Sequence, residues 1–257
     1  MARVLLVVPC FNEAERLRGE DFVRAALAGH ELHFHFVDDG SSDATAERLA
    51  ALAAREPSRV SFSRLPHNQG KGEAVRAGML TGVGARPAFD YVGFWDADLA
   101  TPLDELGAFV STLEAQPHKD IVIGARVALL GRHIDRKLYR HAYGRVFATA
   151  VSQLLSVEVY DTQCGAKLFR VNDDLRAVLA GPFLSRWVFD VEILARYVAR
   201  YDAQGLELGE RVVELPLQVW TDIAGSKVGV RDAARAFLEL RRIAVRYASV
   251  LDPRRSR

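Results

Sequence analysis

The chain has 257 residues, with 34 Lys or Arg against 33 Asp or Glu and 49% hydrophobic residues. This composition is typical of a folded globular protein, and a net charge of +1 gives no overall attraction to nucleic acid, so no nucleic-acid partner is expected. No run reaches the about 18 apolar residues that a membrane-spanning helix needs, the first residues lack a signal-peptide pattern, and two cysteines build no disulfide framework. We therefore expect a cytoplasmic protein without a transmembrane helix.

Short apolar runs alternate with helical patterns over the first half of the chain. Strands are predicted at Val4–Val8, His33–Val37, Val60–Arg64, Tyr91–Trp95 and Asp120–Gly124. Helices are predicted at Glu13–Ala28, from Ser42 or Asp43 to Arg55, at Gly72–Gly82 and at Leu103–Glu114. Strands that alternate with helices in this way predict an α/β fold, with a Rossmann-like, mainly parallel twisted sheet flanked by helices.

The alternation becomes irregular after Gly124. The remaining expected elements are a basic and then helical segment at Gly131–Leu155, a loop and strand at Val159–Phe169, a helix at Ser185–Arg200, a strand at Arg211–Val219 and a helix at Arg231–Leu251. We expect one catalytic domain over residues 1–227, followed by a basic amphipathic helix and tail over residues 228–257.

Two carboxylates, Asp96 and Asp98, follow the fourth predicted strand. In extended backbone, residues two apart face the same side, so both side chains can point at one spot. Hard oxygen ligands suit Mg²⁺ or Mn²⁺ bridging a diphosphate. A solvated turn is the simpler explanation of such a pair, but ligands of open α/β sheets bind at the carboxyl ends of strands. We predict a metal site at Asp96 and Asp98.

Two more polar loops follow predicted strands. Asp38 and Asp39 end the second strand, where a carboxylate could accept hydrogen bonds from a base or a ribose, although an Asx turn with a helix cap would explain the residues that follow. The segment 68–72 is glycine-rich, contains Lys71 and opens a helix, but it lacks the spacing of a P-loop or a dinucleotide site. Alone, it is equally consistent with a turn that exposes a lysine.

These segments together resemble family 2 glycosyltransferases with the GT-A fold. The resemblance is carried, in order, by Pro9–Glu13, Val37–Ser41, Asn68–Gly72 and Asp96–Asp98. Three downstream segments resemble the dolichyl-phosphate β-glucosyltransferase branch of the polyprenyl-phosphate glycosyltransferases: Asp161–Phe169, Trp187–Glu192 and Trp220–Lys227. Leu99–Pro102 stands where the related mannosyltransferases usually carry a Gln, which favours the glucosyl side.

The resemblance implies a set of donor-binding residues. Pro9, Phe11 and Glu13 would line the nucleotide pocket, with Asp39 at the base. Asp98, helped by Asp96, would hold Mg²⁺ or Mn²⁺ on the diphosphate of a nucleotide sugar, with UDP-glucose as the expected donor. The remaining expected donor-site residues are Lys71 in the glycine-rich segment, Gln163 and Asp190 near the sugar, and Lys227 over the diphosphate.

The acceptor implied by the resemblance is a polyprenyl phosphate. A phosphate monoester has a second pKa of about 6, so its oxygen is mostly anionic at neutral pH and needs cations more than a general base. Arg126 resembles one phosphate-binding arginine of the family, Arg140 stands where a second is expected, and Asp161 could orient the acceptor or a sugar hydroxyl. Arg132 and Arg136 lie eight and four residues before Arg140, which predicts a cationic helix face or a solvated basic helix.

The C-terminal segment departs from the rest of the chain in charge. Residues 227–257 hold nine Lys or Arg against three Asp or Glu, whereas residues 1–226 hold 25 against 30. An apolar stripe is predicted at Val230, Ala233, Phe237, Leu240, Ala244, Tyr247 and Leu251. This helix could lie on a membrane surface and make the protein peripheral, or it could dock on the catalytic domain with its arginines solvated.

The sequence therefore predicts an inverting, metal-dependent glycosyltransferase that moves glucose from UDP-glucose to a polyprenyl (dolichyl-type) phosphate. One alternative keeps the enzyme but gives it a soluble hydroxyl acceptor, for which Asp161 or Asp190 would be the general base. A second alternative is a protein that binds a nucleotide sugar without turnover. The sequence leaves the oligomeric state open.

Overall fold

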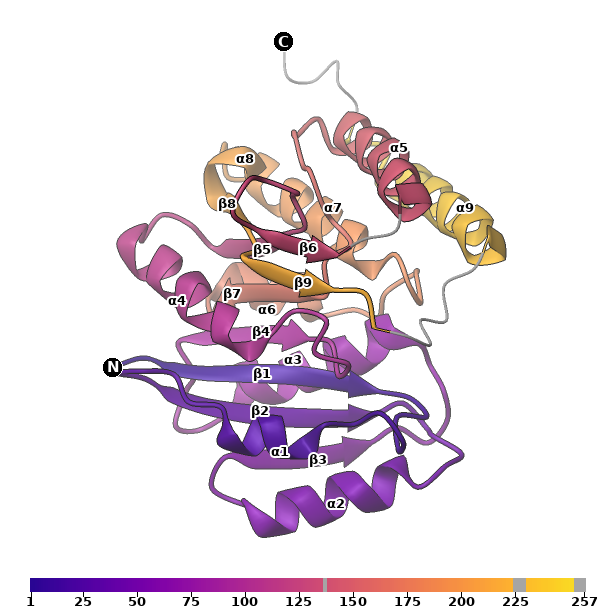
Figure 1. Cartoon of the computed structure of the whole chain (residues 1–257). Coiled ribbons are helices and arrows are strands. Elements are labelled where there is room, and N and C mark those ends of the chain that lie inside the picture. Colours follow the sequence, from indigo (N-terminus) through magenta and orange to yellow (C-terminus); the bar gives the residue numbers. More distant parts are fainter. Residues whose placement is uncertain (136–137, 224–229, 252–257) are drawn as a thin grey trace.

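A seven-stranded sheet runs through the centre of the computed structural model (Figure 1). The structure describes residues 1–135, 138–223 and 230–251, and for residues 138–141 and 230–234 it describes the backbone alone. The strands of the sheet are, in spatial order, β3 (Val60–Arg64), β2 (Glu31–Asp38), β1 (Arg3–Cys10), β4 (Tyr91–Trp95), β7 (Ala166–Arg170), β5 (Ile121–Ala125) and β8 (Val212–Pro216). β7 is antiparallel to both neighbours, and the other pairs in this sheet are parallel. The predicted twisted, mainly parallel sheet is confirmed.

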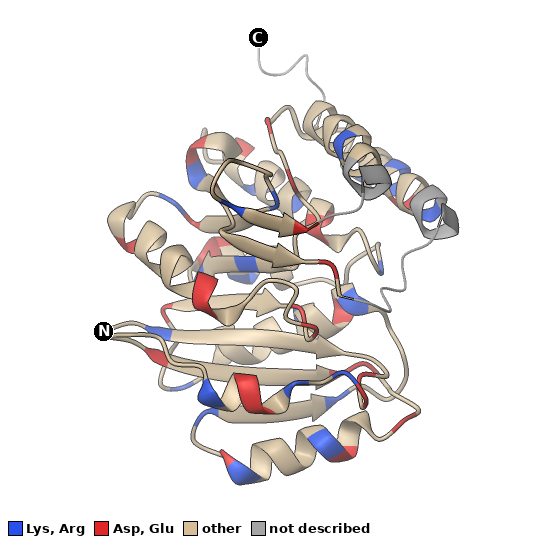
Figure 2. Cartoon of the chain, in the orientation of Figure 1, with Lys and Arg blue, Asp and Glu red and all other residues tan. Residues whose placement is uncertain are grey.

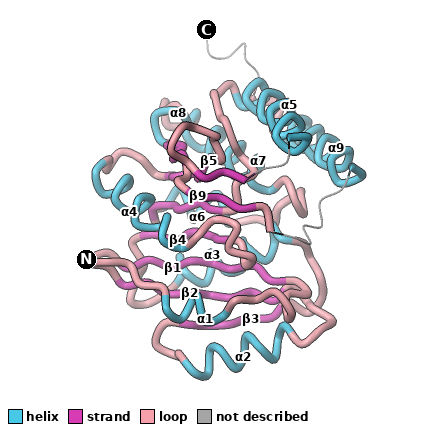
Figure 3. Tube along the Cα trace, viewed as in Figure 1, coloured by secondary structure: helices cyan, strands magenta, loops and turns pink. Residues whose placement is uncertain are grey.

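Helices cover both faces of the sheet (Figure 3). Successive side chains of a strand point to opposite faces, so β1 places Leu5 and Val7 in one core and Leu6 and Val8 in the other. The first core also contains side chains of α3 (Lys71–Gly84), α5 (Leu138–Leu155), α6 (Asp173–Leu179), α7 (Phe189–Asp202), α8 (Leu208–Arg211) and α9 (Val230–Arg246). The second contains side chains of α1 (Gly19–Arg24), α2 (Thr45–Arg55) and α4 (Leu106–Ala115), which the short 3-10 helix η1 (Leu103–Glu105) precedes.

The predicted helix at Glu13–Ala28 is wrong over most of its length, since α1 covers only Gly19–Arg24. Tertiary hydrogen bonds hold the preceding residues as a loop. The backbone N–H of Asn12 donates to Ser41 Oγ at 2.9 Å, and that of Glu13 donates to Thr45 Oγ1 at 2.8 Å. These bonds tie the end of β1 to the loop that follows β2 and to the first residue of α2.

The second half contains short elements that the sequence did not predict. β6 (His133–Asp135) and β9 (Val219–Thr221) form a separate parallel pair beside the main sheet, and α6 and α8 are also new. The predicted helix at Ser185–Arg200 begins later, at Phe189. In the turn before it, Ser185 Oγ accepts hydrogen bonds from the N–H groups of Trp187 and Val188.

The C-terminal helix α9 lies beside α5 and also contacts α7 (Figure 1). Leu240, Ile243 and Leu251 are buried in the core, whereas Phe237, from the predicted apolar stripe, is 38% exposed. The predicted domain boundary at residue 227 lies outside the described residues. None of the helices that the structure describes has the length and apolar character needed to cross a membrane.

Candidate active site

The predicted site loops meet at one edge of the main sheet. β1, β2, β3 and β4 are parallel, so the loops at their carboxyl ends open on the same side. β7 runs the other way, so its amino-terminal end brings the segment 161–165 to that edge as well. Figure 2 shows acidic and basic residues gathered in the loops at this edge.

Asp39 organises the glycine-rich loop. Its carboxylate accepts hydrogen bonds from the backbone N–H of Gln69 at 2.7 Å, from that of Gly70 at 2.9 Å and from the amide of Asn68 at 3.0 Å. Burial nevertheless raises the pKa of Asp39 above its ordinary value, since it outweighs these hydrogen bonds. The close approach of the two loops also requires Gly40, whose φ is +65° and whose Cβ would lie 2.5 Å from the His67 carbonyl carbon.

Lys71 faces the acidic pair at the end of β4. Its Nζ lies 2.5 Å from Asp96 Oδ1, and Asp98 Oδ1 accepts a hydrogen bond from the backbone N–H of Ala100 at 3.1 Å. Burial and the neighbouring charge of Asp96 raise the pKa of Asp98. Burial lowers the pKa of Lys71, but the charges of Asp96 and Asp190 outweigh it and raise that pKa overall. A second cation beside Asp96 and Asp98 would therefore relieve the repulsion between the two carboxylates.

Gly165 lets the Asp96 carboxylate occupy its position. A Cβ at residue 165 would lie 1.9 Å from Asp96 Oδ2, and the Gly165 carbonyl accepts the backbone N–H of Asp96 at 3.1 Å. Glycine is needed here because of the close approach of backbone to carboxylate, not because of an unusual φ. No group of three or more His, Cys, Asp or Glu within the described residues is arranged to hold a metal by itself. A metal on Asp96 and Asp98 would therefore need oxygens from a ligand.

Arg126 and Asp161 form a two-pronged ion pair beside this acidic cluster. The Nε of Arg126 donates to Asp161 Oδ2 at 2.6 Å, its Nη2 donates to Oδ1 at 2.7 Å, and its backbone N–H donates to Oδ2 at 3.1 Å. The guanidinium also lies 5.2 Å from the centre of the Trp220 ring. Burial lowers the pKa of Arg126, but Asp161 outweighs it and raises the pKa overall, so Arg126 stays charged.

Asp190 is buried and forms an ion pair with Lys167. Its Oδ1 is 2.5 Å from Lys167 Nζ, and the two side chains are 7% and 1% exposed. Lys167 Nζ also donates to the Cys164 carbonyl at 2.7 Å. Burial raises the pKa of Asp190, and the two lysines at positions 167 and 71 act against that rise. The structure thus places Asp190 within electrostatic reach of Lys71 and Asp96 while its carboxylate is paired with Lys167.

The other predicted donor residues surround this centre. Phe11 is 36% exposed at the end of β1, and Pro9 is half-buried within β1. Glu13 pairs with Arg16 at 2.5 Å, and its charge contributes to the raised pKa of Asp98. The Nε2 atom of Gln163 is buried without a hydrogen-bond partner in the described part of the chain.

Two predicted site residues cannot be located by their side chains. Lys227 lies outside the described residues, and only the backbone of Arg140, near the start of α5, is described. The sequence reasoning also missed Lys167 and Glu214 as members of the charged network. Both are ionisable residues within short, otherwise mainly apolar strands, β7 and β8. Because ionisable residues are rarely buried without a partner, this pattern could have indicated them in the sequence.

Comparison with known proteins gives a consistent family. The chain matches glycosyl transferase family 2 over residues 5–175. A dolichyl-phosphate β-glucosyltransferase of Trichomonas vaginalis is 30% identical over 257 residues, which cover 95% of this chain and 72% of that protein. The enzymes with this name from Dictyostelium discoideum and Homo sapiens are each 31% identical, over 87% of this chain and 68% of their own length.

A solved structure shares the fold. It is the glucosyl-3-phosphoglycerate synthase of Mycobacterium tuberculosis, crystallised in complex with Mn²⁺ and UDP-glucose. The TM-score is 0.68 at 15% identity, and the match covers 98% of this chain and 81% of that one. The chain therefore belongs to glycosyl transferase family 2 and is a nucleotide-sugar-dependent glycosyltransferase with the GT-A fold.

Proposed function

We propose that the protein transfers glucose from UDP-glucose to a polyprenyl phosphate of the dolichyl type, with inversion at the anomeric carbon and with a divalent metal ion. The observation that carries this proposal is the juxtaposition of two charged groups at one sheet edge. The carboxylates of Asp96 and Asp98 follow β4, and the Arg126–Asp161 pair joins the residue after β5 to the segment before β7. The names of the sequence relatives support glucose and dolichyl phosphate as the two substrates.

The acidic pair fits a divalent cation. Asp96 and Asp98 would hold it through hard oxygen ligands, and the donor diphosphate would complete its coordination. When bound, the metal would neutralise charge that develops on the leaving nucleoside diphosphate. Lys71 lies beside Asp96 and would bring a second positive charge to the diphosphate. The buried Nε2 of Gln163 is a hydrogen-bond donor that a sugar hydroxyl could satisfy.

Arg126 would bind the acceptor phosphate while its guanidinium stays paired with Asp161. The bonds to Asp161 use Nε and Nη2, and within the described residues no side chain or carbonyl accepts a hydrogen bond from Nη1. Guanidinium groups present five donors in a planar fork, so Nη1 can meet a phosphate oxygen without breaking the pair. Because the phosphate oxygen is already anionic, this arrangement needs no general base. Arg140 remains our expected second phosphate ligand.

The transfer reaction can be tested directly. The chain is incubated with Mn²⁺, a panel of nucleotide sugars and a short polyprenyl phosphate, and the lipid products are identified by mass spectrometry. UDP-glucose should give a glucosylated lipid phosphate whose anomeric coupling constant shows inversion. Absence of any lipid product would overturn the proposal, and products only with soluble hydroxyl acceptors would replace it with the alternative reaction.

Asp98→Asn should reduce transfer by at least about 100-fold, because it removes a charged metal ligand. Asp104→Asn is a matched control, since Asp104 is an exposed carboxylate in η1. Equal activity of the two variants would contradict the metal site at Asp98.

We further propose that α9 contacts an anionic membrane surface through its solvent face. Leu238 and Val245 are 60% and 71% exposed and lie seven residues apart, on one stripe of the helix. Exposed arginines flank this stripe at Arg235, Arg241, Arg242 and Arg246. On the neighbouring helix α5, Val146 is 63% exposed. Apolar side chains between arginines are typical of helices that lie in a lipid interface.

Flotation with anionic and with neutral lipid vesicles tests this contact. The wild-type chain should float with anionic vesicles, and the bound fraction should fall as salt is added. The double variant Leu238→Glu, Val245→Glu should lose flotation. The control Ala51→Glu, Ala54→Glu adds the same charge to exposed positions on α2, at the far end of the molecule in Figure 1, and should float normally. Flotation that survives the α9 changes would contradict the proposal.

A further inference from the structure

We infer that Glu214 is a positioning residue for the acceptor-phosphate site, because its carboxylate holds the backbone of Tyr160 and Asp161 and thereby places the Arg126–Asp161 pair. This role in acceptor use rests on the function proposed above. Glu214 lies on β8, opposite Ile123 in the neighbouring strand β5.

Both oxygens of Glu214 are engaged by consecutive backbone groups. The N–H of Tyr160 donates to one carboxylate oxygen at 2.7 Å, and the N–H of Asp161 donates to the other at 2.8 Å. The carboxylate therefore fixes the position relative to β8, and the orientation, of the backbone from which the Asp161 side chain extends. Because Arg126 directly follows β5, Glu214 joins the two members of the ion pair through one strand pairing.

Glu214 has no ion-pair partner among the described residues to explain its presence in the sheet. Burial raises the pKa of its carboxyl group, and the two backbone N–H groups act against that rise. A half-buried carboxylate in an otherwise apolar strand is unfavourable unless its oxygens are hydrogen-bonded. The two hydrogen bonds from residues 160 and 161 therefore account for a carboxylate at this position in β8.

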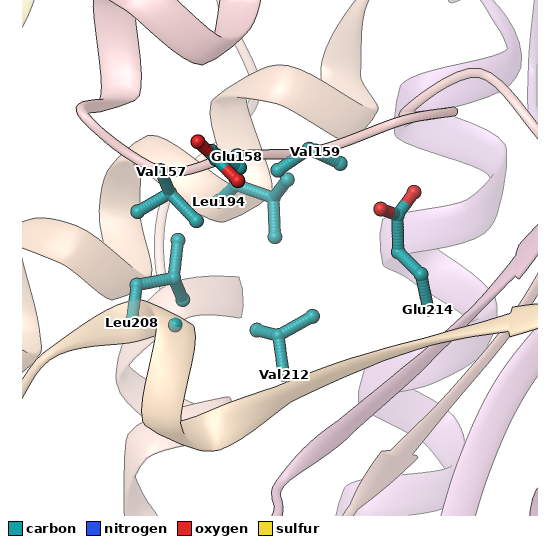
Figure 4. Close-up of a pocket in the computed structure, with 8 residues that line it drawn as sticks. Val157, Glu158, Val159, Leu194, Leu208, Val212 and Glu214 are labelled. Atoms are coloured by element: carbon teal, nitrogen blue, oxygen red, sulfur yellow. The ribbon is translucent and has the colours of Figure 1, made fainter.

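Packing alone does not hold the segment that Glu214 binds. A cavity of about 90 Å³ lies beside residues 157–159, which lead into this segment, and is lined chiefly by Val157, Val159, Leu194, Leu208, Val212 and Glu214. Figure 4 shows Glu214 at one side of this cavity, with its carboxylate directed toward the backbone that continues from Val159. A segment with empty space on one side depends on hydrogen bonds for its position, since dispersion contacts are missing there.

Polar contacts from α5 also hold this segment. Ser152 Oγ accepts the N–H of Val159 and donates to its carbonyl, both at 3.1 Å. Arg145 Nη1 donates to the Tyr160 carbonyl at 3.1 Å, and its guanidinium lies 3.9 Å from the centre of the Tyr160 ring. These contacts come from α5 and leave the N–H groups of residues 160 and 161 to Glu214.

The variant Glu214→Gln tests the inference. It keeps the size of the side chain but places an NH₂ group against one of the two N–H donors, so the segment must shift. We expect the KM for a polyprenyl phosphate to rise about tenfold and the KM for the nucleotide sugar to stay within about twofold, which corresponds to about 1.4 kcal/mol at the acceptor site. Glu158→Gln is the matched control, because Glu158 lines the same cavity and is exposed.

A double-mutant cycle separates positioning from general destabilisation. If Glu214 acts through Asp161, the effects of Glu214→Gln and Asp161→Asn on acceptor KM should be strongly non-additive. Additive effects, or equal changes in both KM values, would overturn the inference. If Glu214→Gln fails to fold, Glu214→Asp takes its place with the same expectations.

A measurement that does not depend on sugar transfer tests the positioning role of Glu214 separately from the proposed reaction. Hydrogen exchange followed by NMR should show that the amide protons of Tyr160 and Asp161 lose protection in Glu214→Gln, while amides in β5 keep theirs. Unchanged protection would overturn the positioning role even in an active enzyme. Lost protection in a chain that transfers no sugar would contradict the proposed function alone.

Discussion

Asp96 is held from two sides by its neighbours. Lys71 Nζ lies 2.5 Å from Oδ1, and the bare backbone of Gly165 lies against Oδ2. Neither contact can be read from the pair Asp96 and Asp98 itself, because Lys71 opens α3 and Gly165 precedes β7. Two positions that are remote in sequence therefore decide where this carboxylate points.

Gly165→Ala should weaken metal binding. Its Cβ would lie 1.9 Å from Asp96 Oδ2, so the carboxylate must turn away. We expect Mn²⁺ affinity in the presence of UDP, measured by calorimetry or by the free-ion signal in electron paramagnetic resonance, to fall at least about tenfold. Gly209→Ala is the control, because no atom lies within 4 Å of its added Cβ. Similar Mn²⁺ affinity in both variants would argue against this constraint.

Lys167→Met should strongly destabilise the fold. It leaves the Asp190 carboxylate, which is 7% exposed, without its cationic partner, and breaking a buried ion pair costs about 3–5 kcal/mol. Urea denaturation measures the free energy of unfolding. The double variant Lys167→Met, Asp190→Leu should recover most of the loss, because no buried charge remains. A loss below about 1 kcal/mol in the single variant would show that water reaches the pair.

At the scale of elements, α9 has two faces with different roles. Its inner face packs on α5 and α7 through buried side chains, and its outer face carries exposed apolar residues and arginines. The sequence offered docking and membrane contact as alternatives for this helix. The structure shows the docked inner face and leaves the outer face for the proposed membrane contact.

Ile243→Ala should destabilise the protein much more than Val245→Ala. Ile243 is fully buried, and truncation of a buried Ile costs about 2–5 kcal/mol, whereas Val245 is 71% exposed and its truncation should change the free energy of unfolding by less than about 0.5 kcal/mol. Thermal and urea unfolding of both variants provide the comparison. Equal stabilities would mean that α9 does not dock as described.

The pairing of β2 with β3 should make stability sensitive to acid. His35 lies between Ser61 Oγ at 2.7 Å and Ser63 Oγ at 2.9 Å, and burial lowers its pKa from 6.5 to about 4. Between these values the unfolded chain binds more protons than the folded one, so this contribution to stability is complete above pH 6.5 and is lost as the pH falls toward 4.

The loss should reach on the order of 3 kcal/mol, from about 1.4 kcal/mol per pKa unit. Urea denaturation at a series of pH values measures it. His35→Leu should flatten this part of the profile, whereas His67→Gln, at an exposed position, should not. An unchanged slope in His35→Leu would assign the acid sensitivity to other groups.

At the scale of the whole molecule, charge is distributed unevenly along the chain. Residues 227–257 carry an excess of positive charge, and residues 1–226 carry an excess of negative charge. The described arginines of α9 lie on a helix beside α5, separated from the strand ends where the acidic pair lies (Figures 1 and 2). A nearly neutral total therefore conceals an acidic catalytic body and a basic C-terminal element.

Local patterns in the sequence were enough to predict the strands of the main sheet and the place of the acidic pair after β4. Val60–Arg64 and Tyr91–Trp95 were predicted with the bounds that the structure has, because short apolar runs between polar loops are a local property. The acidic pair Asp96 and Asp98 was also predicted at the carboxyl end of a parallel strand, where open α/β sheets bind ligands. Arg126 and Asp161 were expected only from the family resemblance.

Only the tertiary structure decided which charged groups pair. Lys71 with Asp96, Arg126 with Asp161, and Lys167 with Asp190 each join separate elements, and Glu214 reaches residue 160 from a strand more than fifty positions away. Likewise, the backbone N–H groups of residues 12–14 donate hydrogen bonds to the segment after β2, a connection that the local pattern does not show. Sequence by itself determined the class of fold and the chemistry available, because both follow from local periodicity and residue type. The partners of each charge depend on distances across the sheet, which only packing sets.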